Sequence, residues 1–188
     1  MRTPACPSMR PRGFTLLEML ATIAVAGVLI SIAVPNMSSF LRSQQVTTAA
    51  DGLNSAVAQA RTIAAASNSY VSVAAIGGDW RNGWQVFKEG GTPDGAYAPG
   101  TDTLIAQHDQ LPPGIAVTSA TVPPGLGYVS FSPVGYSQTV PAKTQMSMTV
   151  GFQLDQNSRV VDINLLGRAR VCNPNREGDT CAMPAATP

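Results

Sequence analysis

Metal-binding side chains are scarce in this 188-residue chain, which has one histidine and three cysteines. The histidine, His108, stands beside Asp109 with no nucleophile motif around it, and no serine lies in a G-x-S-x-G pattern. A structural zinc site draws on several cysteine and histidine ligands, which this composition does not supply. The sequence therefore predicts no metal site, no cofactor and no enzymatic activity.

Acidic residues are absent from the first 13 residues, which contain three arginines. The next 21 residues, Phe14–Val34, carry a single charge, Glu18. A helix crosses the apolar core of a bilayer with about 20 apolar residues, so a transmembrane helix is predicted at 14–35. Basic residues before this span predict a cytoplasmic N-terminus and an exported remainder.

Glu18 is the unusual residue of this span, because a carboxylate in a bilayer core costs about 2.5–3.5 kcal/mol. One interpretation places it near the helix start, where the helix dipole favours an anion. Another supposes cleavage after Gly13, which leaves a free amine on Phe14 one helical turn from Glu18. The amine and the carboxylate would then pair, within one chain or between copies of it.

The segment Gly13-Phe14-Thr15-Leu16-Leu17-Glu18 resembles the class III signal of type IV pilins and pseudopilins. The resemblance implies that a prepilin peptidase cuts after Gly13 and methylates Phe14. It also implies that Glu18 guides the subunit into a filament with other pilins. The alternative is an ordinary secretory signal peptide with a site at Ala24-Val25-Ala26, but such a peptide has a shorter and uncharged apolar core.

Removal of the leader at 1–13 would take three of the 12 basic residues and Cys6, leaving nine basic residues against 11 acids. A net charge of about −2 excludes bulk binding of polyanions, so any nucleic-acid binding needs a local patch. Cys172 and Cys181 then remain, an even count in an exported chain, which predicts one disulfide. Two free thiols or half of a metal site are the alternatives.

A helical stripe of small apolar residues follows the span, at spacings of three and four. From Ser67 the period changes to two, with strands predicted at 70–76, 84–88, 103–107, 115–118, 127–132, 146–154 and 159–166. One helix from Phe14 to about Ala66, followed by strands, predicts an α+β fold in which the helix packs on antiparallel sheets. The predicted parts are a leader at 1–13, a membrane or filament-core helix at 14–35, an amphipathic helix at 36–66, a β-rich domain at 67–172 and a disulfide loop with a tail at 173–188.

The segment from Trp80 to Phe87 contains Asn82-Gly83, a dipeptide typical of hairpin turns. Trp80 and Trp84 are interpreted as packing residues. The segment also resembles the Gly-Trp-x-Val-Phe hairpin of the FimT/GspH family of minor pilins and pseudopilins. With the N-terminal signal, this resemblance implies a type IV pilin-like fold.

Four arginines gather near the C-terminus with one acid among them, Asp162; they are Arg159, Arg168, Arg170 and Arg176. If residues 167–171 are extended, Arg168 and Arg170 lie on the same side, about 6.6 Å apart. That is close to two phosphate steps of about 3.4 Å along a DNA strand, and arginine bonds two phosphate oxygens at once. The alternative is a charged edge strand that prevents aggregation between sheets.

The segment Gly167-Arg168-Ala169-Arg170 resembles the Gly-Arg-x-Arg tail of FimT-type minor pilins, which bind DNA in natural transformation. The resemblance implies DNA contacts for Arg168 and Arg170 and a turn role for Gly167, whereas charge alone points to Arg176. No aromatic residue follows Phe152, so the expected contact is with phosphates and is indifferent to base sequence.

Together these features predict a FimT-like minor pilin that binds extracellular DNA for uptake. Its expected partners are the prepilin peptidase, other pilins, the inner membrane and DNA. It is expected in the bacterial inner membrane as a single-pass protein with a periplasmic domain, and then on the cell-surface pilus. The alternative is a GspH-like pseudopilin of a type II secretion system without DNA binding.

Overall fold

The computed structural model describes residues 13–185, without the side chains of residues 32–36. The chain divides into two units, one ending at Phe40 and one beginning at Leu41. Apart from Gly13, the predicted leader lies outside the described residues, and so do the last three residues of the predicted tail.

The first long element is the helix α1 (Leu16–Ser67). Thr15 caps its start, since its side-chain oxygen accepts a hydrogen bond from the Glu18 amide at 3.2 Å. The large apolar side chains of its early turns are exposed, among them Leu16, Leu17, Leu20, Ile23, Val28, Leu29 and Ile30. Within the described residues, no helix combines the length and the apolar character needed to cross a membrane.

The end of α1 has a local cause in Asn68, which adopts a left-handed φ of 48°. The following amide, that of Ser69, donates to the carbonyl of Ala64 at 3.2 Å. This pattern closes a helix and turns the chain away from its axis. The predicted helix from Phe14 to about Ala66 is therefore confirmed.

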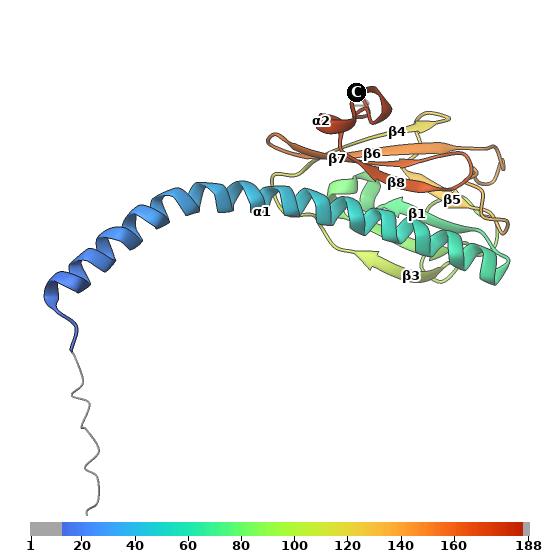
Figure 1. Ribbon diagram of the computed structural model, residues 1–188. Coiled ribbons are helices and arrows are strands. Elements are labelled where there is room, and N and C mark those ends of the chain that lie inside the picture. Colours follow the sequence, from blue (N-terminus) through green and yellow to red (C-terminus); the bar gives the residue numbers. More distant parts are fainter. Residues whose placement is uncertain (1–12, 186–188) are drawn as a thin grey trace, which may run out of the picture. The chain divides into compact units, whose positions relative to one another are not determined.

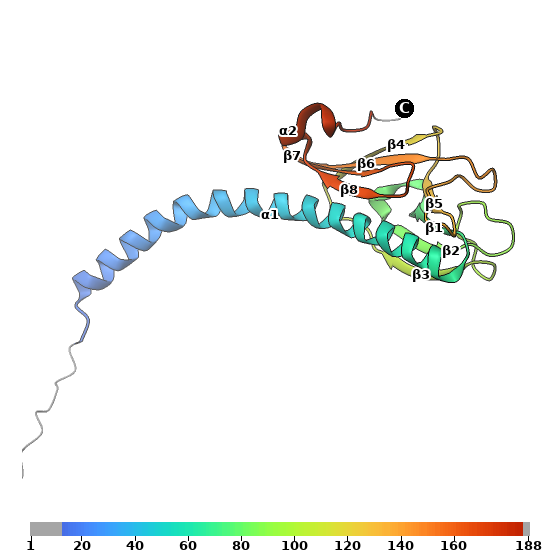
Figure 2. The ribbon, with the colours of Figure 1, turned by 45° about the vertical axis from the view of Figure 1, so that its right-hand side comes forward.

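Two antiparallel four-stranded sheets form the rest of the second unit (Figures 1 and 2). The first has the order β3-β2-β1-β5 and consists of β1 (Val71–Ala75), β2 (Trp84–Lys88), β3 (Thr103–His108) and β5 (Tyr128–Phe131). The second has the order β4-β6-β7-β8 and consists of β4 (Ala116–Val122), β6 (Ser147–Leu154), β7 (Asn157–Ile163) and β8 (Ala169–Cys172). β8 is thus an edge strand, and both figures show it beside α1.

The core lies between α1 and the two sheets. The predicted stripe is buried, with Val46, Ala49, Ala50, Leu53, Ala56, Val57, Ala60 and Ala64 at most 8% exposed. Because most of these side chains are alanines, the helix backbone lies close to the sheets. Trp80 and Trp84 belong to the same core, as their interpretation as packing residues required.

The predicted hairpin joins β1 to β2, through a connection longer than a two-residue turn. This connection contains two short helices, η1 (Ile76–Gly78) and η2 (Trp80–Asn82), so Asn82-Gly83 does not form a two-residue hairpin turn. The antiparallel pairing of the two strands is nevertheless as expected. The longer connection allows Trp80 to turn into the core, where it is 4% exposed.

A buried carboxylate, that of Glu89, organises the loop after β2. It accepts hydrogen bonds from the hydroxyl of Ser72 and from the amides of Asp94 at 3.2 Å and Gly95 at 3.1 Å. Burial raises the pKa of this carboxyl above its usual value of 4.5, against the three hydrogen bonds and with a smaller contribution from the charge of Asp102. The loop is therefore built around a carboxyl group whose burial disfavours the charged form.

Candidate functional site

The arginine motif lies at the hairpin that joins β7 to β8. The side chain of Asn164 accepts hydrogen bonds from the amides of Leu166 and Arg168, both at 3.0 Å. Gly167 has a φ of 72°, a conformation that costs other residues about 1–2 kcal/mol. A Cβ on Gly167 would also lie 2.5 Å from the carbonyl oxygen of Gly135. Gly167 thus occupies a turn position that suits glycine alone.

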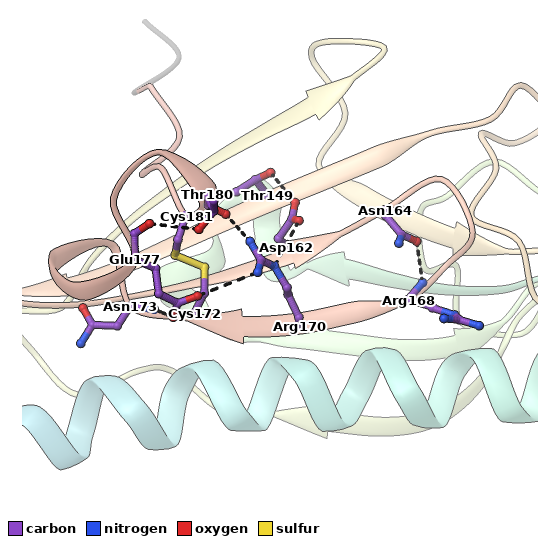
Figure 3. A network of polar contacts seen from close by, with 10 residues as sticks. All are labelled: Thr149, Asp162, Asn164, Arg168, Arg170, Cys172, Asn173, Glu177, Thr180 and Cys181. Atoms are coloured by element: carbon purple, nitrogen blue, oxygen red, sulfur yellow. Dashed lines mark hydrogen bonds and ion pairs between the residues drawn. A yellow bond between two sulfur atoms is a disulfide. The ribbon is translucent and has the colours of Figure 1, made fainter.

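Arg170 lies in β8 directly opposite Asp162 of β7, and half of its side chain is exposed. Its guanidinium nitrogens lie 3.9 Å from the carboxylate of Asp162 and 3.9 Å from that of Glu177. The guanidinium also donates a hydrogen bond to the carbonyl of Thr180 (Figure 3). Two carboxylates and a carbonyl therefore already surround Arg170, although exposed ion pairs of this kind contribute only about 0–1 kcal/mol.

Arg168 precedes β8 and is exposed. Its guanidinium makes no hydrogen bond or ion pair with residues 13–185. Figure 3 shows the side chain of Arg170 extending toward the disulfide loop and that of Arg168 extending away from it. The expected placement of both on one side depended on an extended 167–171 segment, which is not formed because Gly167 is in a turn and β8 begins only at Ala169.

The predicted disulfide is present between Cys172 and Cys181, whose Cα atoms are 6.0 Å apart. Both residues are buried and pack with Val160 and Met183 in a small cluster separate from the main core. The bond closes a loop that contains α2 (Pro174–Glu177) and η3 (Gly178–Thr180). This loop is thereby attached to the edge strand β8.

The short helix α2 begins at Asn173, whose side chain accepts a hydrogen bond from the Asn175 amide at 3.0 Å. The carboxylate of Glu177 accepts one from the Asn173 amide at 2.9 Å. Arg176 lies on the same helix and is exposed. The loop therefore presents Arg176 to solvent and directs Glu177 toward Arg170.

The N-terminal candidates lie in the first unit. Gly13 and Phe14 precede α1 and are exposed, and Glu18 is in the first helical turn and is also exposed. A carboxylate in a first turn is favoured by the helix dipole. The position of Glu18 agrees with both interpretations offered for it.

Elsewhere, His108 has a packing role. Its ring stacks on Trp84 with the ring centroids 4.0 Å apart, and its Nδ1 is 2.8 Å from the carbonyl oxygen of Asp109. Among residues 13–185, no group of three or more histidine, cysteine, aspartate or glutamate side chains is arranged to hold a metal ion.

Two protein-family profiles match the chain. A prokaryotic N-terminal methylation motif matches residues 8–34, which include Gly13, Phe14 and Glu18. The profile of the type II transport protein GspH matches residues 49–167, more than half of the chain. The chain belongs to the GspH family. It is therefore a minor pilin or pseudopilin, a subunit of a type IV pilus or of a type II secretion system, and not an enzyme.

The fold of this GspH-family chain is similar to that of a solved type IV minor pilin, FimU of Pseudomonas aeruginosa strain PAO1. One crystal form has a TM-score of 0.54 and 20% identity, over 76% of this chain and 99% of FimU. A second has a TM-score of 0.49 and 20% identity, over 72% and 99%. At this identity the first likeness concerns the fold alone, and it confirms the predicted α+β architecture. No curated protein matches the chain in sequence.

The methylation motif has consequences for the GspH-family chain as a whole. It implies processing by the prepilin peptidase and assembly with other pilins. It also implies anchoring in the inner membrane before assembly. The predictions about these partners are confirmed at this level, whereas the roles of Gly13, Phe14 and Glu18 individually stay predictions.

Two residues near the arginine motif were not among the candidates. Arg61 of α1 donates through Nε to the carbonyl of Gly135 at 2.9 Å and lines a groove with Arg168. No local pattern connects Arg61 to Arg168, which are far apart in the sequence. The position of Glu177 on a short helix could have been recognised in the sequence, since Asn173-Pro174 before a glutamate is a pattern typical of a helix start.

Proposed function

We propose that this GspH-family chain is a minor pilin of a type IV pilus that binds extracellular DNA without sequence preference, for uptake in natural transformation. The observation that carries the proposal is the exposed guanidinium of Arg168, which has no partner among residues 13–185 and follows the glycine turn at Gly167. Arg170 and Arg176 are exposed in the same region. These three exposed arginines are the local positive charge that DNA binding by a nearly neutral chain requires.

The expected contact is between arginine and phosphate. A guanidinium bonds two phosphate oxygens through parallel hydrogen bonds. Because no aromatic residue follows Phe152, the tail offers no surface on which bases could stack. Binding should therefore be similar for unrelated DNA sequences and should weaken strongly with salt.

The arginines should not contribute equally. At Arg170 a phosphate competes with the carboxylates of Asp162 and Glu177, whereas Arg168 has no such competitor among the described residues. Arg168 should therefore make the larger contribution.

The test is fluorescence anisotropy of labelled duplex DNA with the full processed chain in detergent micelles. Two to four phosphate contacts give a slope of log K against log salt of about −2 to −4. The double variant Arg168→Gln with Arg170→Gln should bind more weakly to every duplex and reduce the slope by about 2. The matched control, Arg42→Gln with Arg81→Gln, removes the same charge from ion pairs outside the tail and should bind like the parent.

In cells, the tail variant should reduce natural transformation while pili still form. If instead it binds DNA as well as the parent, the tail is a charged edge strand and the proposal fails.

The second candidate is a GspH-like pseudopilin of a type II secretion system without DNA binding. The description of the matching family profile and the carboxylates around Arg170 favour it. Parent protein that does not bind DNA at low salt, together with a gene placed among secretion genes, would support this candidate.

A further inference from the structure

A groove of about 380 Å³ lies between α1 and the β7–β8 hairpin. Its helix side is formed by Asn54, Val57, Ala58, Arg61 and Thr62, and its hairpin side by Gly167, Arg168 and Ala169. The helix residues are spaced as neighbours on one helix face. Two arginines, Arg61 and Arg168, thus line the groove, and no acidic residue does.

The side chain of Arg61 is oriented by a hydrogen bond to the backbone. Its Nε donates to the carbonyl of Gly135 at 2.9 Å, and the amide of Gly135 in turn donates to the carbonyl of Ser132 at 2.8 Å. The terminal nitrogens of Arg61 make no hydrogen bond or ion pair with residues 13–185. The side chain is therefore oriented through Nε while its other donors stay available.

The carbonyl of Gly135 contacts both segments that carry the two arginines. The Gly135 oxygen that accepts from Arg61 lies 2.5 Å from the position that a Cβ on Gly167 would take. Arg168 is the next residue after Gly167. Two like charges in one groove repel each other. An anion bound by both arginines would offset this repulsion with two charge-assisted hydrogen-bonding contacts.

We infer that Arg61 and Arg168 together bind one phosphodiester of DNA in this groove. The inference rests on the proposed function and deepens it, because it replaces the pair expected from the sequence, Arg168 and Arg170, with a pair drawn from two distant segments. Thr62 and Asn54 are uncharged polar residues of the same groove, so α1 contributes no acidic residue to its lining.

The first experiment is a double-mutant cycle on DNA affinity, measured by anisotropy with the full processed chain in detergent micelles. Arg61→Gln and Arg168→Gln should each weaken binding about tenfold. Because both arginines contact one phosphate, the double variant should lose clearly less DNA affinity than the product of the two single fold-losses. Arg42→Gln, which removes a charge from the same helix, is the matched control and should bind like the parent.

The second experiment does not depend on DNA binding or on a variant that folds. The Nε–Hε resonances of Arg61 and Arg168 in the parent protein are followed by NMR during titration with inorganic pyrophosphate. Both should shift with the same apparent affinity, whereas the resonance of Arg42 should not.

The outcomes separate this inference from the proposed function. If the parent binds DNA and Arg61→Gln folds and binds equally well, the inference is overturned while the proposed function stands. If the parent does not bind DNA but both resonances shift with pyrophosphate, the proposed function is wrong and the groove is an anion site for another phosphate. If neither resonance shifts, the groove is not an anion site and the inference is overturned.

Discussion

The carboxylate of Glu177 lies 3.9 Å from a guanidinium nitrogen of Arg170, although the two residues belong to different elements. The disulfide loop thus places a negative charge beside the arginine motif. An anion that binds Arg170 competes with this carboxylate for the guanidinium.

Glu177→Gln should strengthen DNA binding by a few fold, because it removes the competing charge while the glutamine oxygen can still accept from the Asn173 amide. Anisotropy at low salt measures the change. Asp179→Asn is the control, since it removes the same charge from the same loop and Asp179 makes no ion pair within residues 13–185. Equal gains in both variants would mean that only net charge matters.

Replacement of Cys172 and Cys181 by alanine should destabilise the second unit by about 2.5–3 kcal/mol, because the disulfide closes a short loop. For a domain of this size the melting temperature should fall by about 5–12 °C. Thermal denaturation measures the fall, with reduced parent protein as the reference. Thiol labelling of the processed, oxidised parent, which lacks Cys6, should find no free cysteine without reductant, and quantitative labelling would contradict the prediction.

Gly167→Ala should destabilise the protein more than Gly125→Ala does. Both glycines have a left-handed φ, 72° and 85°, so each alanine costs about 1–2 kcal/mol. Only at Gly167 would the new Cβ meet an atom at 2.5 Å, the oxygen of Gly135, whereas nothing lies within 4 Å at Gly125. Overpacking should add about 1–3 kcal/mol. Urea unfolding of the two variants measures the difference, and equal losses would show that the close approach is unimportant.

The buried carboxyl of Glu89 should make stability depend on pH. Its pKa is higher in the folded than in the unfolded state, where it is near 4.5. The stabilisation that Glu89 contributes to the folded state is therefore fully present below about pH 4.5 and is lost as pH rises through the folded pKa. The unfolding free energy of the parent, relative to Glu89→Gln, should fall between pH 4.5 and neutrality by at most about 1.4 kcal/mol per pH unit. Urea unfolding over this range checks it, and a constant difference would contradict it.

The processed protein should begin at Phe14 with a methylated amine. Mass spectrometry of the membrane-extracted chain measures this, and intact Met1 or cleavage after Ala26 would contradict it. Glu18→Ala should leave processing unchanged but reduce incorporation into filaments, because the amine of Phe14 loses its expected carboxylate partner. Normal incorporation would argue against that pairing.

The helix and most strands could be predicted from the sequence because their signals are local. The stripe that begins at Val46 shows the helical period, and the change to a period of two after Ser67 marks the first strand. The connection before Trp84 was harder, because Asn82-Gly83 is compatible with a tight hairpin and with a longer loop. The longer loop is the one that allows Trp80 to be buried, and its burial depends on the whole core.

The charges around Arg170 could not be predicted in the same way. Asp162 lies opposite Arg170 only because the β7–β8 turn sets that register, and a shift by one residue would place the two side chains on opposite faces. The groove shared by Arg61 and Arg168 depends on packing of a helix against a distant hairpin. The motif identifies the arginines, whereas their neighbours depend on the tertiary fold.

The many alanines on the buried face of α1 bear on how the second unit responds to force. The core joins helix residues from Val46 to Ala64 with strands of both sheets. A pull along this part of the helix acts parallel to the packed surface, so it loads many small contacts at once instead of opening them one after another. Close-packed interiors have low compressibility and transmit strain. The second unit should therefore resist tension along this helix better than tension applied across its edge strand β8.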